Sequence, residues 1–218
     1  MLSRVSPWFL ALVFLGLAVA AMLMPLSSDT VPYAFLFDRA EAHNDQQRFL
    51  NAVVDYSGVG QEELQPLLPR LRPVEKQLPV TLFIAKESGK SVAEVLDLRD
   101  SKRHLLDVLH EAGLENKLLF EGVEGKFPEP YKAAWVEYRM KYRPELSDQQ
   151  VRDLILLQLA HRVTGEPRAD IVKQGAKGRT PELIMAKHKP RPSEDEAKPG
   201  EGDGEKADSK KKAGAKGR

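Results

Sequence analysis

Three short stretches of this chain share a residue order that is typical of a turn between two helices. They read SGVGQEELQ (57–65), SGKSVAEVL (88–96) and TGEPRADIV (164–172). In each stretch an acidic residue stands five positions after a glycine, and an apolar residue follows it. Glycine tolerates the left-handed backbone that closes a helix, so Gly58, Gly89 and Gly165 are predicted to end one helix before the next begins.

The residues after these glycines are suited to starting a helix. Ser91 and Glu94 form a capping box, in which each side chain accepts a hydrogen bond from the backbone amide of the other. The helix that ends at Gly89 is predicted over 80–88. Pro167 is expected in the first turn of the helix after Gly165, where its missing amide costs nothing.

The remainder of the body also carries helix signals. Ser147 and Gln150 form a second capping box before 151–163, and Thr180 precedes a last short helix. We therefore predict an all-α fold of short helical hairpins in one domain, 31–188, with no convincing strand. Whether the repeated corners reflect an internal duplication stays open, because such corners also arise by chance in helical proteins.

The amino-terminal segment, 1–30, is predicted to be a signal peptide or a membrane anchor. Arg4 is its only basic residue, and no charge follows until Asp29. An apolar run of this length can form a hydrophobic helix that contacts the membrane through residues 8–26. Ala18–Ala20 offers a cleavage site, whereas the apolar residues up to Leu26 favour retention. In both cases the body is expected to be exported, either periplasmic or anchored in the inner membrane.

The carboxy-terminal segment, 189–218, has no aromatic residue and no aliphatic residue larger than alanine. Such a segment cannot bury enough apolar surface to offset its ordering entropy, so a disordered charged tail is predicted. Its acidic half precedes a basic half. The tail is either a solubilising segment or a polybasic end that touches an anionic surface.

Composition excludes several classes of protein. The chain has 33 Lys and Arg against 32 Asp and Glu, whereas dedicated nucleic-acid binders are usually strongly basic. It has no cysteine, which excludes a disulfide scaffold, a thiolate zinc site and a cysteine nucleophile.

The search for catalytic or metal motifs yields no site. His110 and Glu111 begin like a zinc-binding HExxH motif, but Leu114 stands where the second histidine belongs. Asp97 and Asp100 share a helical face, as the acids of many solvated helices do. We assign no catalytic residue, metal or cofactor, and we expect a protein that is not an enzyme.

The segment YKAAWVEYRMKY (131–142) carries an aromatic stripe. Tyr131, Trp135, Tyr138 and Tyr142 recur at helical spacing along one side, and Ala133, Val136 and Met140 lie on the opposite side. A helix that is apolar on two faces is either central in its domain or gives one face to a partner. The stripe is thus either core or a binding face for an envelope protein or a glycan.

Four segments together resemble a group of small exported bacterial proteins of unknown function. They are DYSGVGQEEL, LPVTLFIAKESGKSVAEVLDLR, PEPYKAAWVEYR and VTGEPRADIV, and the resemblance covers about residues 45–185. The stretch after Arg99 departs from the pattern, because it lacks the usual glycine and tryptophan. The resemblance implies an all-helical exported domain and no particular activity.

The sequence therefore favours a non-enzymatic interaction or scaffolding module in a bacterial envelope. An alternative is a membrane-anchored helix-turn-helix DNA-binding protein, because Ala85, Gly89, Val95 and Leu98 have a similar spacing to that motif. Its second helix, however, offers three acids and only Arg99 to a DNA phosphate. Nucleic acid is thus not the expected partner. The third hypothesis is an envelope glycan hydrolase, for which no acid/base pair can be named.

Overall fold

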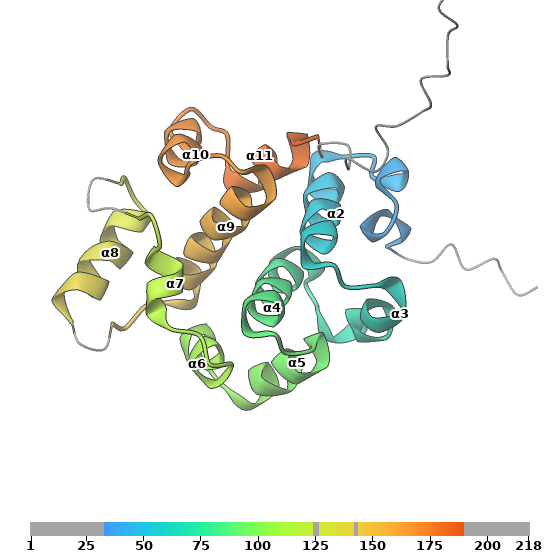
Figure 1. The fold of residues 1–218 in the computed structure, drawn as a ribbon, viewed down its shortest axis with the longest axis horizontal. Helices are drawn as coiled ribbons and strands as arrows, with labels where there is room; N and C mark the ends of the chain where they lie inside the picture. The colour runs from blue at the N-terminus through green and yellow to red at the C-terminus, as the bar shows by residue number, and fades with distance from the viewer. Residues whose placement is uncertain (1–32, 124–126, 142–143, 190–218) are drawn as a thin grey trace, which may run out of the picture. The chain divides into compact units, whose positions relative to one another are not determined.

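The computed structural model describes residues 33–123, 127–141 and 144–189, and the described chain consists of helices joined by turns and loops (Figure 1). No strand occurs in these ranges, which confirms the all-α prediction. The predicted amino-terminal hydrophobic helix and the tail from residue 190 lie outside the described residues. Within the described ranges, no helix is both long enough and apolar enough to span a membrane.

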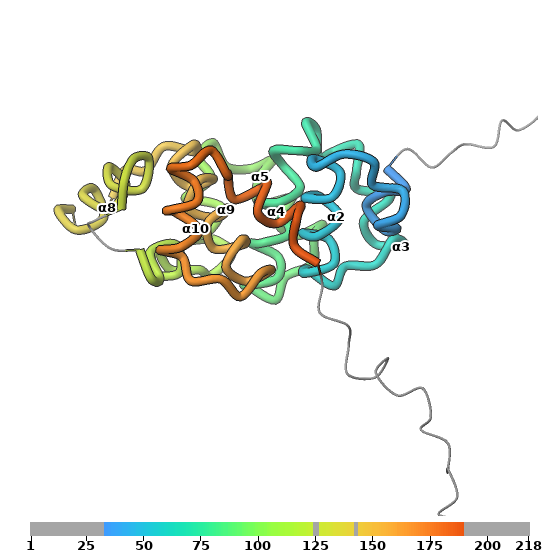
Figure 2. Tube along the Cα trace, turned by 90° about the horizontal axis from the view of Figure 1, so that it is seen from above, coloured from blue at the N-terminus to red at the C-terminus, as the bar shows by residue number. Residues whose placement is uncertain are grey.

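Three long helices form the centre of the fold: α2 (Asp45–Ser57), α4 (Val74–Ser88) and α9 (Asp148–Thr164). They contact one another, and their buried side chains build the core. Figure 1 and Figure 2 both show α8 at one end of the helical body and α3 at the other, with the long helices between them. Representative core side chains, each fully buried, are Val53, Phe83, Ile84, Leu154, Ile155 and Leu157.

Shorter helices surround these three. The 3-10 turns η1 (Ala34–Leu36) and η2 (Arg39–Glu41) precede α2. Helix α3 (Gln61–Leu64) continues into the 3-10 segment η3 (Gln65–Arg70). The remaining helices are α5 (Val92–Ser101), α6 (Leu105–Glu111), α7 (Asn116–Phe120), α8 (Tyr131–Met140), α10 (Arg168–Gly175) and α11 (Pro181–Lys187).

Each long helix ends at a glycine in the left-handed conformation. The φ angles of Gly58, Gly89 and Gly165 are 73°, 69° and 73°. The capping boxes at Ser91 and at Ser147 are both formed. Pro167 differs from the prediction, since it is the N-cap residue before α10 and not part of its first turn.

The three corners share a hydrogen-bonded hydroxyl that the sequence analysis did not recognise. The residue before each glycine is Ser57, Ser88 or Thr164. Its hydroxyl donates to a backbone carbonyl one turn earlier, at 2.7 Å in all three cases. The same oxygen accepts from the backbone amide two residues later. One side chain thus satisfies polar backbone groups on both sides of the turn.

Helix α4 begins earlier than predicted. The prediction placed it over 80–88, after Pro79, whereas the structure begins it at Val74 with Pro79 inside the helix. A proline within a helix removes one backbone hydrogen bond. Burial of Val74 and Leu78 in the core offsets the lost hydrogen bond. The local sequence does not reveal this burial, so the prediction began the helix too late.

The carboxy-terminal ends of the long helices meet through polar contacts. The Tyr56 hydroxyl of α2 donates to Glu87 of α4 at 2.9 Å, and Arg162 of α9 lies 3.7 Å from the same carboxylate. Lys86 donates to the backbone carbonyl of Ser57 at 3.2 Å. Cations are favoured at helix carboxy-terminal ends, so Lys86 and Arg162 are well placed.

A candidate binding trough

The aromatic helix α8 packs its stripe inward. Tyr131 is buried, and Trp135 and Tyr138 pack on Phe120 of α7 with ring centroids 6.0 and 4.2 Å away. Tyr142 lies outside the described residues. Trp135 and Tyr138 remain partly exposed, so the stripe contributes to the core while its role as a binding face stays a prediction.

The opposite side of α8 is the exposed one. Val136 is 50% exposed and Met140 is 80% exposed. Two separated apolar side chains are ordinary on a protein surface and do not by themselves mark a site.

The predicted helix-turn-helix corner carries an ion cluster on its outward side. Asp97 and Asp100 of α5 are exposed, and Arg70 of η3 contacts them at 2.8 and 2.6 Å. Two of the three acids of the candidate recognition helix, Asp97 and Asp100, are therefore paired with a cation of the same chain. The described residues contain no group of three or more His, Asp or Glu side chains placed to hold a metal ion.

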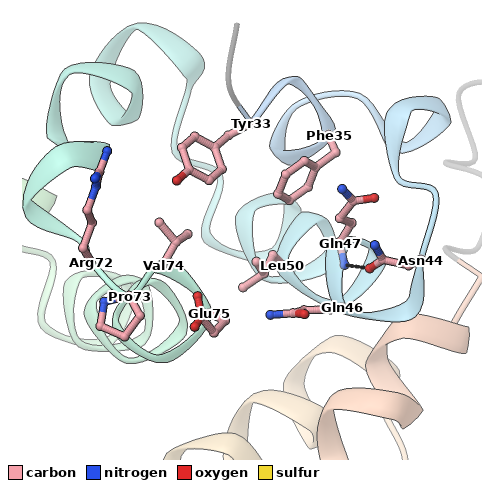
Figure 3. A pocket seen from close by; sticks show the side chains of 10 residues that line it. All are labelled: Tyr33, Phe35, Asn44, Gln46, Gln47, Leu50, Arg72, Pro73, Val74 and Glu75. Atoms are coloured by element: carbon pink, nitrogen blue, oxygen red, sulfur yellow. Dashed lines mark hydrogen bonds between the residues drawn. The ribbon is translucent and has the colours of Figure 1, made fainter.

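An open groove of about 640 Å³ lies beside the first described residues (Figure 3). The aromatic rings of Tyr33 and Phe35, which meet edge to face, form one wall. The start of α4 forms another, with Pro73 and Glu75, and Leu50 of α2 supplies apolar surface between them. We call this hollow the N-terminal groove; its lining is completed by Asn44, Gln46, Gln47, Arg72 and Val74.

The polar side chains of the N-terminal groove divide into two groups. Asn44 accepts from the amide of Gln47 and so caps α2, and Gln47 in turn accepts from the amide of His43. Gln46, Arg72 and Glu75 are exposed. The groove therefore offers one amide, one cation and one anion beside an aromatic wall.

Tyr33 is held in a left-handed backbone conformation, with φ 87°. This conformation is costly for a residue that is not glycine, and such residues concentrate at ligand-contacting positions.

A second hollow, of about 180 Å³, adjoins the groove. We call it the middle hollow. Glu75, near the start of α4, lines both. Its other lining residues come from the first halves of the long helices and from α11: Phe49, Lys76, Pro79, Val80, Gln149, Arg152, Asp153, Leu156 and Glu182.

All three long helices contribute to the middle hollow, and side chains from their last turns contact one another at Tyr56, Glu87 and Arg162.

A third hollow, of about 330 Å³, shares Asp153, Leu156 and Glu182 with the middle hollow. We call it the acidic cavity. Three carboxylates line it, from Glu129, Asp153 and Glu182. The rest of its wall is largely apolar: Pro128, Pro130, Tyr131, Ile171, Val172, Gly175, Ala176, Thr180 and Pro181. Because neighbouring hollows share lining residues, the three lie next to one another, and we call them together the trough.

Burial raises the pKa of two groups in the acidic cavity, Asp153 and Tyr131. It raises the pKa of Asp153, and Glu182 raises this pKa further, while a hydrogen bond from Gln149 and the charge of Arg152 act in the opposite direction. Burial also raises the pKa of the Tyr131 hydroxyl to about 12, with Asp153 and Glu182 adding to the effect. Tyr131 is therefore neutral at pH 7.

Sequence reasoning missed Asp153 and Glu182 as a pair. They lie on α9 and α11, far apart in the chain, and match no motif. One signal was available for Glu182 alone, because Thr180 marks the start of α11 and acids are favoured in the first turn of a helix. That signal does not show that Asp153 lies beside it.

Comparison with protein-family models, with curated proteins and with solved structures finds no match to this chain. The resemblance to small exported helical proteins therefore stays a prediction from the sequence.

Proposed function

We propose that this chain is an exported or membrane-tethered protein of a bacterial envelope that binds an extended partner in its trough without catalysing a reaction. One observation carries the binding role: three hollows lie next to one another on the same helical body, and neighbouring hollows share lining residues. The export part of the proposal rests on the apolar segment 8–26, which lies outside the described residues.

The lining of the trough suits a chain-like ligand better than a compact one. Its two ends differ in chemistry, with aromatic rings at Tyr33 and Phe35 and carboxylates at Asp153 and Glu182. Successive units of a peptide segment or a glycan strand can each contact a different hollow. Because the lining comes largely from helices packed on the core, the surface is preformed.

A glycan hydrolase is a second candidate function, favoured by the proximity of Asp153 and Glu182. Glycoside hydrolysis uses two carboxyl groups, one of them protonated at working pH, and the raised pKa of Asp153 is in the required direction. This hypothesis predicts that purified protein releases reducing sugar from envelope glycan and that Asp153→Asn abolishes the release. The binding proposal predicts no release from either protein.

The binding proposal is testable because the chain lacks cysteine, so a single introduced thiol is unique. Gln46→Cys places the thiol in the N-terminal groove, and Asp107→Cys places it on an exposed part of α6 outside the trough. Each variant is expressed in the native bacterium. It is treated with a thiol-reactive photo-crosslinker that cannot cross the inner membrane.

We expect a crosslinked envelope component from Gln46→Cys and none from Asp107→Cys. Crosslinks of equal yield at both positions, or none at either, would contradict binding in the trough.

A further inference from the structure

We infer that the acidic cavity binds a cationic side chain, so that the partner in the trough is an extended peptide carrying lysine or arginine. This inference rests on the proposed function and narrows its ligand class. It is carried by the size of the cavity, its apolar walls and the balance of charge around it.

The shape and polarity of the acidic cavity match an amphipathic side chain. Its volume of about 330 Å³ is within the range of ligand sites. Leu156, Ile171 and Val172 offer contacts to the methylene groups of a lysine or arginine stem. The carboxylates of Asp153 and Glu182 are available to the charged head group.

The charge in the acidic cavity is not balanced by its own lining. Among the described residues, the cavity is lined by three carboxylates and by no lysine or arginine. Lys76 and Arg152 line the adjoining middle hollow instead; the Arg152 guanidinium lies 3.9 Å from Asp148, and its charge partly offsets the rise in the pKa of Asp153. The Tyr131 hydroxyl is neutral and can only donate or accept a hydrogen bond. A bound cation would supply the missing positive charge.

Two of the three carboxylates also have local structural roles. Glu129 accepts a hydrogen bond from the amide of Ala133 at the start of α8. Glu182 lies in the first turn of α11, where the helix dipole favours an anion.

Asp153 differs, because it lies beyond the first turn of α9 and the helix dipole acts mainly within that turn. It accepts a hydrogen bond from Gln149 at 2.8 Å and is nevertheless partly desolvated beside Glu182. A carboxylate in this position is better explained by a ligand than by the stability of the fold.

The same balance of charge favours a peptide over a neutral glycan. A glycan could stack on Tyr33 and Phe35, but it would bring no positive charge to the acidic cavity, whose own lining has three carboxylates and, among the described residues, no lysine or arginine. A peptide can place a cationic side chain in the acidic cavity while its neighbouring residues contact the N-terminal groove.

The test compares two small probes that differ in charge. Nα-acetyl-lysine methylamide carries the ammonium group, and Nα-acetyl-norleucine methylamide has a similar stem without it. Each is titrated into the purified full-length chain and followed by NMR. Chitotetraose serves as the glycan probe. The variants Asp153→Asn and Glu182→Gln remove the charges with little change in shape, and Asp107→Asn on α6 is the matched control.

We expect the lysine probe to bind about fivefold more tightly than the norleucine probe, as for one partly exposed ion pair. Asp153→Asn and Glu182→Gln are each expected to remove most of this preference, and Asp107→Asn is expected to keep it. Equal binding of the two probes, no binding of either, or a preference that survives both variants would overturn the inference.

The outcomes also separate this inference from the proposed function. If chitotetraose binds in the trough and lysine shows no preference, the binding function stands and the peptide inference falls. If Gln46→Cys still forms its specific crosslink while the lysine preference is absent, only the inference falls. If neither crosslink nor probe binding is found, both fall.

Discussion

At Gly89 the chain turns from α4 to α5 with a φ angle of 69°. No heavy atom lies within 4 Å of the place where a Cβ would stand, so a side chain there meets no steric clash with its surroundings. Gly175, at the end of α10, also has free space but does not have a positive φ angle. The two glycines therefore separate the cost of backbone conformation from the cost of crowding.

We predict that Gly89→Ala lowers the free energy of unfolding by about 1–2 kcal/mol, the usual cost of a left-handed non-glycine residue. Gly175→Ala should raise it by up to about 1 kcal/mol, because alanine has the higher helix propensity. Urea unfolding of the two variants and the parent measures both changes. Changes of the same sign would show that the corner does not depend on backbone conformation.

The titration of Asp153 gives a second prediction at this scale. Because burial raises its pKa above the ordinary 3.8, the folded chain binds this proton more tightly than the unfolded chain does. The stability gained by protonation is present at low pH and is lost as the pH rises from about 3.8 through the folded-state pKa. Above that window the ionised carboxylate destabilises the fold.

Asp153→Asn should therefore be more stable than the parent at pH 7, by less than about 1 kcal/mol after screening by solvent. The difference should disappear near pH 3. Thermal unfolding between pH 3 and pH 8 measures it, with Asp107→Asn as control. A variant that is less stable than the parent at pH 7 would show that Asp153 has a structural role.

Part of this residue-level detail could be predicted from the sequence. The caps Ser91, Ser147 and Thr180 stand in recognisable patterns just before apolar runs. The corner hydroxyls of Ser57, Ser88 and Thr164 lie inside the preceding helix, where a polar residue carries no comparable signal.

Among the elements, α5 begins with a capping box. The Ser91 hydroxyl accepts from the amide of Glu94, and the Glu94 carboxylate accepts from the amide of Ser91. We predict that Ser91→Ala costs about 1 kcal/mol of stability and that Ser91→Thr, which keeps the hydroxyl, costs less. Urea unfolding of both variants measures this, and equal losses would mean that the hydrogen bond contributes little.

Helix α8 offers a sharper test because one of its two apolar faces packs inward and the other is exposed. Tyr131 is 9% exposed and Met140 is 80% exposed. We predict that Tyr131→Ala costs about 3 kcal/mol, as for other buried aromatic residues, and that Met140→Ala changes stability by less than about 0.5 kcal/mol. Chemical denaturation distinguishes the two, and similar losses would contradict the inward packing of the stripe.

The existence of most helices could be predicted from caps and apolar spacing. Which face of a helix is buried, and at which residue a helix begins, could not be predicted in the same way. In α8 either apolar face satisfies the helical period, and the inward one is decided by Phe120 on α7. In α4 the start at Val74 depends on burial of side chains before Pro79. Both depend on contacts with distant parts of the chain.

For the molecule as a whole, the trough and the corners lie at opposite ends of α2, α4 and α9. At the corner end, Tyr56, Glu87 and Arg162 connect the three helices. At the other end their first halves, with α11, line the middle hollow. No sequence pattern predicts this convergence, because it follows from the packing of helices that are distant in the chain.

The central claim is that the trough faces outside the cytoplasm and is covered by a partner in the cell. The most direct test is the labelling rate of Gln46→Cys and Asp107→Cys with a thiol reagent that cannot cross the inner membrane. The labelling rate in cells whose outer membrane has been permeabilised is compared with the labelling rate of the purified variants.

We predict that both cysteines react in cells and that Gln46→Cys alone reacts more slowly there than in the purified protein. Labelling of both only after lysis would place the body in the cytoplasm and restore the DNA-binding alternative. Equal rates for Gln46→Cys in cells and in the purified protein would show that the trough has no partner.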